Sequence, residues 1–535
     1  MKEISDTKRN EIINLGLFSI SLIPVILYLY VIYQRISLPF DLEWGEGAGI
    51  NQISRILSGE PLYAAPTENF AALVYTPFYY WLSSLLAVIA HEITFAARLI
   101  SVMASFGSAG IVAWLVHKET GNRMASWLAG VLYLACFALS DGFYDLVRVD
   151  SLYVLVLLVS FFFLRASSKP AGKIAAGLAI ALGFFIKQST LIVFFPITLY
   201  LVIKNWRTYW TFLLTVLLGV LGPFCWLNAR SEGWFNYYII RLPKEHGYSL
   251  VSAVNFWVGD LMGPLGIALG FGLVYILMRW AKQPGRGKKN VQLSKTKDAE
   301  ETEGKERRNK FQLFALFSLG AVGAAWATRA SNGGGANNAM SAYAAISLLF
   351  GLGFNEVGKL IAKDAKTANN YSILVASFVT IQFIGLIYNP FNFLPTAAEV
   401  RANEMLIDEI AEIDGLIWAP YRSHLPRLVG KKSSIHAVNL FELTGYFKGT
   451  VLPEGNDLVQ QIRENVCNQA YGLIVLDQPI PWIDEQLSMA YQQDRKFGFL
   501  DGERRSSLLV WQGGLDALFI PRHQYNPDVC LSRIP

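Results

Sequence analysis

Residues 174–203 read IAAGLAIALGFFIKQSTLIVFFPITLYLVI, two apolar runs separated by the polar tetrapeptide KQST at 187–190. Two basic residues precede this stretch and two follow it (Lys169, Lys173, Lys204 and Arg207). By the positive-inside rule both ends lie in the cytoplasm, which a single crossing cannot achieve. The sequence therefore predicts two short helices that meet at a polar tip, 187–190, on the external side of a membrane.

Apolar runs of similar length lie on both sides of this hairpin. We predict spans at 12–33, 95–116, 124–139, 149–164, 209–227, 261–278, 311–328, 339–354 and 371–388. Together with the hairpin they make about eleven crossings, since about 20 apolar residues cross the hydrocarbon core. The chain is 53% hydrophobic and 16% charged, whereas soluble domains carry about a quarter charged residues. This pattern predicts an α-helical polytopic membrane protein.

The charges around the first span set the orientation of the others. Lys2, Lys8 and Arg9 precede it, so the N-terminus is predicted to be cytoplasmic. This run is long for a signal peptide and ends without a small-residue cleavage site, which indicates a signal anchor. The transmembrane domain is then 1–389, with a first external loop at 34–70, an interfacial helix at 76–89 and a polar cytoplasmic linker at 279–310.

Residues 390–535 are predicted to form a small extracytoplasmic α/β domain. The patterns favour helices at 400–413, 457–466 and 484–492, and strands at 416–419, 471–476 and 507–511. Cys467 and Cys530 both fall in this domain and could form a disulfide in an oxidising compartment, but the sequence leaves their distance open. The cysteines show no zinc-site spacing, and the positive excess lies on cytoplasmic segments, so nucleic acid is not implied.

The first external loop is acidic. Asp41, Glu43 and Glu46 fall within six residues, just beyond the first span. If the chain is helical from Glu43 onward, Glu43 and Glu46 share one face. Like charges beside hydrocarbon raise one pKa, which favours a general base or a cation site. Carboxylates that are simply solvated are the alternative.

Three further ionisable residues lie where external loops meet spans. Lys187 is at the tip of the hairpin, where an ammonium group and helix ends would suit a phosphate. Arg148 and Asp150 lie where the second external loop enters a span. A local Arg–Asp pair and a snorkelling lysine are the plainer alternatives.

The loop 329–338 holds three glycines and three asparagines. Glycines allow a ligand to approach the backbone closely, and asparagine amides can bind sugar hydroxyls. Asn337 and Asn338 are therefore candidate substrate ligands, together with Tyr75 of the aromatic segment 75–81, which would face a lipid. An ordinary flexible turn would have a similar composition.

Several of these segments resemble one known family. They are the acidic first loop, RILSGEPLY at 55–63, YTPFYYWLSSLL at 75–86, AARLISVMAS at 96–105, RVDSLYVLVLLVS at 148–160 and FFIKQSTLIVFFP at 184–196. Together they look like the GT-C glycosyltransferases, in the branch of the protein O-mannosyltransferases and the lipid A aminoarabinose transferase. The resemblance covers roughly residues 10 to 350 through loosely spaced patterns, and it leaves the C-terminal domain out.

The resemblance implies inverting transfer of a sugar from a polyprenyl phosphate to an acceptor hydroxyl on the extracytoplasmic face. Glu46 or Glu43 would be the base, with Asp41 third. Many members have adjacent acidic residues here, whereas Gly45 precedes Glu46, so the identity of the base stays open. Binding of the donor phosphate would fall to Lys187, Arg148 and Gln188, and binding of substrate to Asp150, Tyr75, Asn337 and Asn338.

The resemblance also implies the partners. These are a polyprenyl-phosphate sugar, a glycan, lipid or protein acceptor, and the bilayer. No clear Asp-x-Asp motif is present, so we predict no obligatory metal, and binding of a divalent cation is left open. The one N-x-S/T site, at 370–372, lies at a predicted cytoplasmic helix end, which favours a bacterial plasma membrane.

Two other functions fit parts of the pattern. A transporter or flippase could line a pathway with the same charged residues, but transporters often have two similar halves with matching broken helices, and only one such hairpin is evident. A sensor or assembly scaffold would need no charged residues near its spans. The charges at 41–46, 148–150 and 187 therefore favour an enzyme.

Overall fold

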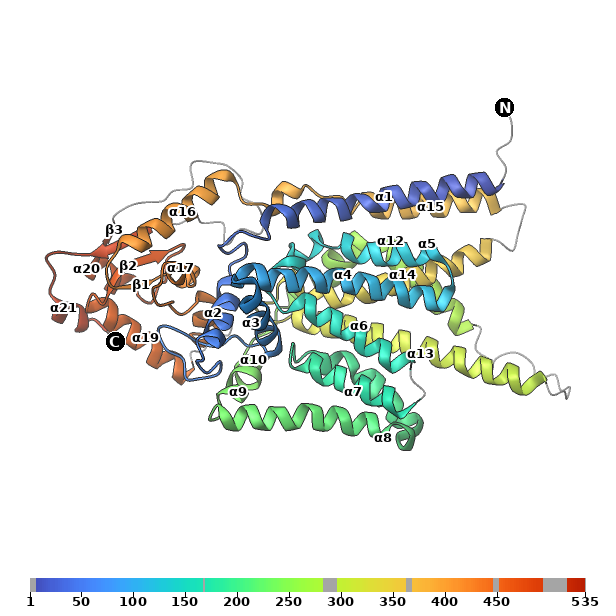
Figure 1. Ribbon diagram of the computed structural model, residues 1–535, viewed down its shortest axis with the longest axis horizontal. Helices are drawn as coiled ribbons and strands as arrows, with labels where there is room; N and C mark the ends of the chain where they lie inside the picture. The colour runs from blue at the N-terminus through green and yellow to red at the C-terminus, as the bar shows by residue number, and fades with distance from the viewer. Residues whose placement is uncertain are drawn as a thin grey trace, which may run out of the picture.

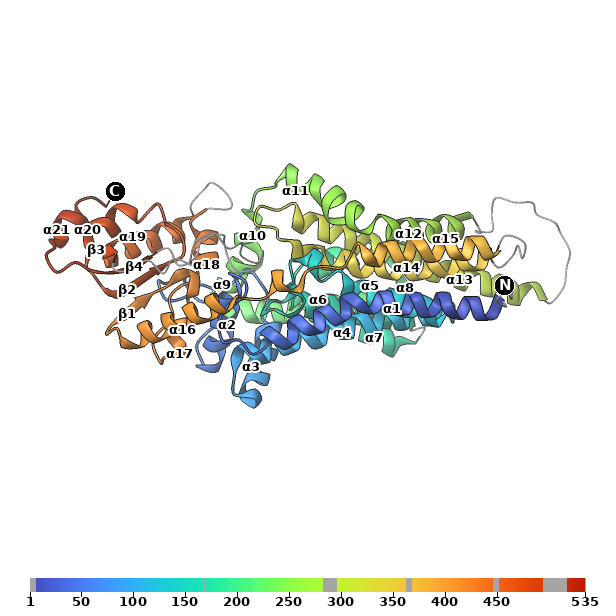
Figure 2. The same cartoon turned by 90° about the horizontal axis from the view of Figure 1, so that it is seen from above.

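The computed structural model describes residues 6–166, 169–281, 296–361, 368–445, 452–493 and 517–534. They form a long bundle of helices, with a smaller part that contains a sheet at one end (Figure 1). The first helix, α1 (Asp6–Arg35), begins at the end of the bundle that is far from the sheet (Figures 1 and 2). The opposite end is called the sheet end below.

The bundle confirms the predicted membrane architecture. Besides α1 it contains α4 (Ile93–Thr120), α5 (Arg123–Ala135), α6 (Asp150–Ala166), α7 (Pro170–Phe184), α8 (Thr190–Arg230), α12 (Gly263–Ala281), α13 (Thr296–Arg329), α14 (Met340–Ile361) and α15 (Ala368–Ile384). Each predicted span falls on one of these helices. Seven helices in the described ranges are long and apolar enough to cross a bilayer. Leu29, Leu217 and Leu277 are exposed on them, as expected for side chains that face lipid.

The hairpin predicted at 174–203 is present. α7 ends three residues before Lys187 and α8 begins three residues after it, so Lys187 lies in the turn. α8 contains one residue with non-helical angles, Asn205 at φ −169° and ψ 82°. This kink separates the second leg of the hairpin from the next predicted span, at the point where the basic flanking residues lie.

Two glycines allow the helices of the bundle to pack closely. A Cβ on Gly320 of α13 would lie 1.9 Å from the carbonyl oxygen of Val193 in α8, and one on Gly353 of α14 would lie 1.9 Å from that of Phe271 in α12. Only glycine leaves room for such contacts. A larger side chain at either position would push apart two helices that position loops at the sheet end.

The first external loop lies between the bundle and the C-terminal part. It contains α2 (Glu46–Leu57) and is followed by α3 (Phe78–Ala90) (Figure 1). α2 packs against the C-terminal part, and the Asn51 amide donates to Ser423 Oγ over 2.8 Å. α3 is too short to span a bilayer and exposes Leu85 and Ile89, which fits an interfacial helix.

Short helices complete the sheet end. They are α9 (Trp234–Asn236), α10 (Leu242–Lys244) and α11 (Leu250–Asn255), followed in the C-terminal part by α17 (Leu425–Leu428) and α18 (Ala437–Leu443). α9 lies next to α2 in both views, near the junction with the C-terminal part (Figures 1 and 2). Segments that were predicted as separate external loops therefore meet at one end of the molecule.

The C-terminal part is a small α/β unit, as predicted. Its strands are β1 (Leu416–Trp418), β2 (Tyr471–Leu476), β3 (Tyr491–Gln493) and β4 (Ala517–Pro521), in the order β1-β2-β4-β3. β1 is parallel to β2, whereas β4 is antiparallel to β2 and β3. The helices around it are α16 (Ala397–Glu412), α19 (Pro453–Cys467), α20 (Asp484–Ala490) and α21 (Pro527–Leu531).

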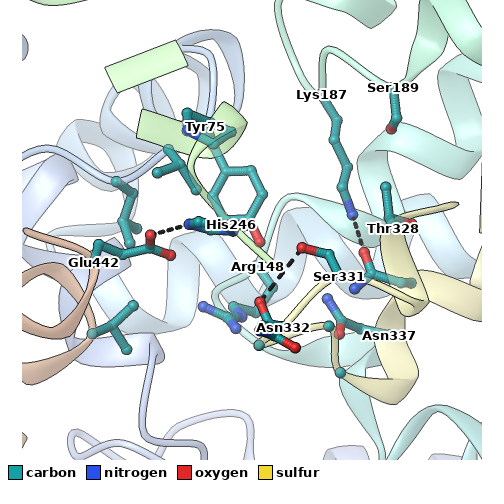
Figure 3. A pocket seen from close by; sticks show the side chains of 18 of the residues that line it. Tyr75, Arg148, Lys187, Ser189, His246, Thr328, Ser331, Asn332, Asn337 and Glu442 are labelled. Atoms are coloured by element: carbon teal, nitrogen blue, oxygen red, sulfur yellow. Dashed lines mark hydrogen bonds and ion pairs between the residues drawn. The ribbon is translucent and has the colours of Figure 1, made fainter. Parts of the chain in front are cut away.

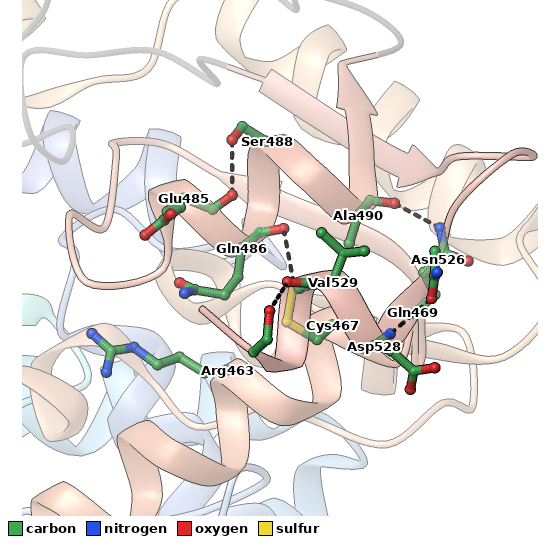
Figure 4. Close-up of a disulfide and its surroundings, with 12 residues drawn as sticks. Arg463, Cys467, Gln469, Glu485, Gln486, Ser488, Ala490, Asn526, Asp528 and Val529 are labelled. Atoms are coloured by element: carbon green, nitrogen blue, oxygen red, sulfur yellow. Dashed lines mark hydrogen bonds between the residues drawn. A yellow bond between two sulfur atoms is a disulfide. The ribbon is translucent and has the colours of Figure 1, made fainter. Parts of the chain in front are cut away.

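Two expectations for this part need comment. The helix predicted over 484–492 ends at Ala490, because the chain from Tyr491 pairs with β4 as a strand. The strand predicted at 507–511 lies outside the described residues, as does 282–295 of the predicted linker. The disulfide that the sequence left open joins Cys467 of α19 to Cys530 of α21 (Figure 4).

Candidate functional site

A cavity of about 400 Å³ lies at the sheet end, where the bundle meets α18 (Figure 3). Its walls come from the first loop and the segment after it, the segment before α6, the α7–α8 turn, residues 243–248, the loop 327–338 and α18. These are mostly segments that the topology predicts to be external. We call this space the reaction cavity.

Lys187 reaches into the reaction cavity from the α7–α8 turn (Figure 3). Its Nζ donates to Asp150 Oδ1 over 2.7 Å and to Asn338 Oδ1 over 2.9 Å. Asp150 Oδ2 accepts from the Asn337 amide over 3.0 Å. An ammonium group has three donors, so one remains for a ligand. The aromatic ring of Tyr75 lies 5.8 Å from Nζ.

The turn that carries Lys187 is tied to the segment after the first loop. The side chain of Gln188 donates to the carbonyl oxygen of Val74 over 2.9 Å. The hydroxyl of Thr76 donates to the backbone carbonyl oxygen of Phe184 over 2.8 Å. These bonds fix the position of the ammonium group relative to Tyr75 and the aromatic segment.

Glu43 and Arg148 form a second charged pair in the wall of the cavity. Arg148 Nε lies 3.4 Å from Glu43 Oε2. Burial raises the pKa of Glu43, and the nearby Arg148 offsets only part of this rise. A Cβ at Gly45 would lie 2.4 Å from Arg148 Nη1, so glycine is needed for the guanidinium to reach this place. The pair thus sets a carboxylate of raised pKa beside a cation.

Glu46 lies elsewhere. Its carboxylate accepts from Arg98 at both oxygens, at 3.1 and 2.8 Å, and from the backbone N–H groups of Leu42 and Val147, each at 2.7 Å. Although burial opposes ionisation, Arg98 and these bonds lower the pKa of Glu46. The expectation of one helical face for Glu43 and Glu46 is wrong, because α2 begins only at Glu46. Glu46 does not line the cavity.

The other two predicted acidic residues are also outside the lining. Asp41 Oδ1 lies 2.7 Å from His424 Nδ1 of the C-terminal part, and burial raises the pKa of Asp41. A Cβ on Gly47 would lie 2.5 Å from Asp41 Oδ2, so the contact depends on glycine there. Asp150 does not line the cavity itself, but it accepts a hydrogen bond from Lys187, which does.

The chain is similar to known proteins in sequence pattern and in fold. A family model described as dolichyl-phosphate-mannose-protein mannosyltransferase matches residues 74–226. Two crystal structures of ArnT from Cupriavidus metallidurans, one bound to undecaprenyl phosphate and one in the apo state, share 11% identity with a TM-score of 0.58, covering 94% of this chain and 97% of that chain. The chain has the GT-C fold.

An oligosaccharyltransferase from Archaeoglobus fulgidus, tethered with an acceptor peptide, has 11% identity and a TM-score of 0.48, covering 86% of this chain and 69% of that one. No curated protein matches the chain in sequence. The likeness to ArnT extends beyond residues 10 to 350, because it covers 94% of the chain, so the GT-C fold in this chain includes much of the C-terminal part.

Within this GT-C fold the cavity gathers seven of the predicted site residues. They are Glu43, Tyr75, Arg148, Lys187, Gln188, Asn337 and Asn338. They come from five separate stretches of sequence. The three predicted residues outside the lining are Asp41, Glu46 and Asp150.

Sequence reasoning missed the His246–Glu442 pair in the wall of the cavity. His246, between α10 and α11, and Glu442, on α18, both line it, and His246 Nε2 is bonded to Glu442 Oε2 (Figure 3). The only sequence signal for His246 was its place in a predicted external loop. Glu442 belongs to the C-terminal part, so this wall of the GT-C cavity exists only because that part docks on the bundle.

Proposed function

We propose that this protein is a membrane glycosyltransferase that moves a sugar from a polyprenyl-phosphate donor to an acceptor hydroxyl, with inversion, on the extracytoplasmic face. The observation that carries the proposal is that one cavity holds a carboxylate of raised pKa, Glu43, together with two cations, Lys187 and Arg148. Glycosyl transfer from a lipid phosphate needs a base for the acceptor and positive charge for the leaving group.

Glu43 serves as the base. Its raised pKa favours uptake of the acceptor hydroxyl proton. The acceptor oxygen then attacks the anomeric carbon on the face opposite the phosphate, and the bond from that carbon to the phosphate oxygen breaks. The bonding electrons leave with the phosphate, so the configuration inverts. Glu46 is a poor choice for this step, since both of its oxygens are held by Arg98 and backbone N–H groups.

Lys187 and Arg148 receive the leaving phosphate. Lys187 has one donor left after Asp150 and Asn338, and the guanidinium of Arg148 presents five N–H donors, of which Glu43 and Gly45 occupy only part. Because these two cations already supply positive charge where the phosphate would leave, we expect no obligatory metal. Transfer should persist in excess EDTA, and a loss that Mg²⁺ restores would overturn this expectation.

The lipid part of the donor needs an apolar approach. Tyr75 and Ile192 line the cavity, and the aromatic helix α3 follows directly after the segment that carries Tyr75. The ArnT structure with a similar fold is bound to undecaprenyl phosphate. This likeness supports a polyprenyl phosphate as the lipid. The extracytoplasmic placement rests on the positive-inside rule, which puts the first loop and the C-terminal part outside.

The proposal is tested by a transfer assay on the purified chain in detergent with a defined undecaprenyl-phosphate sugar. Glu43→Gln should lower kcat by about 10²- to 10⁴-fold, the usual contribution of a general base. Lys187→Met should also lower kcat, since it removes charge from the leaving group. The matched control is Glu404→Gln, an exposed carboxylate on α16, which should have no effect.

Two outcomes would contradict the proposal. Unchanged transfer in Glu43→Gln removes Glu43 as the base. Movement of a labelled lipid phosphate across reconstituted vesicles, with no sugar transferred, would favour the alternative of a transporter or flippase. The anomeric coupling constant of the product in NMR separates inversion from retention.

A further inference from the structure

A second cavity, of about 470 Å³, lies where the first loop meets the C-terminal part. It is formed by the end of α2, the segment 60–70 and the loop after α17. Four of its lining side chains are basic and one is acidic (Arg55, Arg427, Lys431, Lys432 and Glu60). The proposed reaction assigns no role to this space. We call it the basic cavity.

The positive charge of the basic cavity is only partly compensated. Arg55 lies 2.7 Å from Glu60, the one carboxylate in the lining. Arg427 donates to the hydroxyl of Ser58, and Lys431 caps the last carbonyl groups of α16. No acceptor for the Lys432 ammonium is found among the described residues. Neutral partners satisfy donors but cancel no charge, so an excess of positive charge remains.

The guanidinium groups of Arg55 and Arg427 both line the basic cavity and repel each other. Burial lowers the pKa of Arg55, and Arg427 contributes to this lowering because the two cations repel. Burial likewise lowers the pKa of Arg427. Glu60 supplies only one negative charge for the two partly buried guanidinium groups, and an uncompensated buried charge is costly. A bound anion in the cavity would relieve this cost.

The uncharged part of the lining suits a sugar. It consists of Asn51, Thr67, Asn69 and Ser433, with amide and hydroxyl groups, and the aromatic Phe70. The Arg55 guanidinium lies 4.1 Å from the ring centre of Phe70. Asn51 is buried, and its Oδ1 has no hydrogen-bond donor among the described residues. Hydroxyl groups of a saccharide could use these donors and acceptors, whereas a simple anion would leave most of them unused.

The basic cavity is a near neighbour of the reaction cavity. Phe70 lines the basic cavity and Leu73 lines the reaction cavity, and only the buried Ala71 and Ala72 separate these two residues along the chain. Three residues of extended chain reach at most about 11 Å. An extended saccharide that leaves the basic cavity along residues 70–73 would reach the reaction cavity, which Glu43 lines.

We propose that the basic cavity binds an anionic saccharide, such as one with uronic acid groups, and that this is the charged part of the acceptor. The role as acceptor site rests on the proposed function, whereas the binding of the saccharide does not. The ligand class follows from the uncompensated cations together with the hydroxyl-binding lining. Specificity for an acidic glycan acceptor would then reside outside the reaction cavity.

The test is calorimetric binding of tetragalacturonate to the full chain in detergent, with galactotetraose as the neutral probe and inorganic phosphate as the simple anion. The double variant Arg427→Glu/Lys432→Glu should weaken binding of tetragalacturonate by at least about tenfold, as expected for about 0.7 kcal/mol at each site. Arg401→Glu, an exposed reversal on α16, is the control and should bind normally. Equal melting temperatures of the variants show that both are folded.

Each other outcome has a defined meaning. Equal binding by the double variant, or no binding of tetragalacturonate by the native chain, overturns the proposal. If galactotetraose binds as tightly as tetragalacturonate, charge has no role in recognition. If phosphate binds as tightly as tetragalacturonate, the cavity is a site for simple anions and not for a saccharide. If tetragalacturonate binds but no transfer from a lipid-phosphate sugar occurs, the saccharide site stands and the proposed function fails. The reverse result removes the saccharide site alone.

Discussion

Glu43 and Glu46 are three positions apart and have opposite environments. Glu43 faces the reaction cavity with a raised pKa, and Glu46 is locked to Arg98 with a lowered one. The difference arises because α2 begins at Glu46, so the two side chains do not share a helical face. Their roles can be separated by two different measurements, one of rate against pH and one of stability.

The pH dependence of transfer should report the pKa of Glu43. A base must be ionised, so kcat/KM should fall as pH falls through the raised pKa of Glu43, that is, at a pH above the ordinary value of 4.5. We would measure kcat/KM between pH 4.5 and pH 8. The residual activity of Glu43→Gln should lack this acid limb. An identical limb in that variant would assign it to another group.

The substitution Glu46→Gln should instead destabilise the protein. It leaves the fully buried Arg98 without its counter-charge, which typically costs about 3 to 5 kcal/mol. The thermal unfolding midpoint in detergent is the measurement. Glu43→Gln, which also replaces a glutamate of the first external loop by glutamine, serves as the control. A stable Glu46→Gln enzyme with no transfer would return Glu46 to the role of base.

Some residues of the site could be predicted from the sequence and some could not. Lys187 was identified because charge between two apolar runs is costly without a purpose. Glu43 could be recognised as a candidate but not separated from Glu46, because that depends on where one helix begins. Arg98 is not among the predicted site residues, since an arginine in a span gives no sign of which carboxylate it binds.

At the level of elements, α18 carries a wall of the reaction cavity and depends on a titratable cap. His436 Nδ1 accepts a hydrogen bond from the backbone N–H of Val438, which a protonated ring could not do at that atom. Burial lowers the pKa of His436 to about 3. The neutral ring is therefore the form that holds the first turn of α18, the helix from which Glu442 reaches the cavity.

The free energy of unfolding should decrease as pH falls, because His436 is buried in its neutral form. The folded pKa is lowered, so the unfolded chain binds the proton first, and stability is lost as pH falls from about 6.5 towards 3. For a folded pKa of about 3 the loss at pH 5 is about 2 kcal/mol. Unfolding midpoints at pH 7.5 and pH 5 provide the measurement. His436→Asn, which can still cap but does not titrate, should show a smaller difference between them; an equal difference would contradict the assignment.

The disulfide between α19 and α21 should stabilise the C-terminal part. It closes a loop between residues 63 positions apart, and such a link restricts the unfolded chain by typically about 2 to 4 kcal/mol. Cys530→Ser should lower the thermal unfolding midpoint by an amount that corresponds to this loss of free energy. Cys225→Ser, at an exposed cysteine without a disulfide, is the control. A midpoint unaffected by Cys530→Ser would show that the pair does not hold the fold.

Elements were predicted well where one pattern dominates. The spans and β2 are predicted from continuous apolar runs, which indicate their structure without knowledge of the segments that pack against them. The sequence predicts the end of a helix at β3, because Tyr491 to Gln493 has no distinctive pattern and is a strand only through its pairing with β4. The hairpin α7–α8 was predicted because charge at both ends excluded a single crossing.

At the scale of the whole molecule, the orientation can be tested by labelling. The positive-inside rule predicts the C-terminal part outside and the far end of the bundle inside. In a Cys225→Ser background, an impermeant thiol reagent should label Arg401→Cys of α16 on intact cells, and Lys359→Cys of α14 only after permeabilisation. Both positions are exposed, so access depends on the side of the membrane alone. The opposite pattern would place the reaction cavity in the cytoplasm.

The contacts that no local pattern predicted are those between distant parts of the chain. His246 and Glu442 are 196 residues apart, and His424 meets Asp41 across a similar junction. Such pairs follow from the docking of the C-terminal part on the first loop, and docking depends on surface shape rather than on periodicity. The sequence could therefore predict the membrane fold and one half of the cavity, but not the half that the C-terminal part supplies.

The bond between His246 and Glu442 has a practical consequence for engineering. Because α18 forms one wall of the reaction cavity, the residues after α15 cannot be exchanged between relatives as an independent domain. A chimera with a grafted C-terminal part would have a foreign surface facing the reaction cavity, and it would also bring a different basic cavity or none. Grafts of this kind should therefore alter which acceptors react while the lipid donor stays the same.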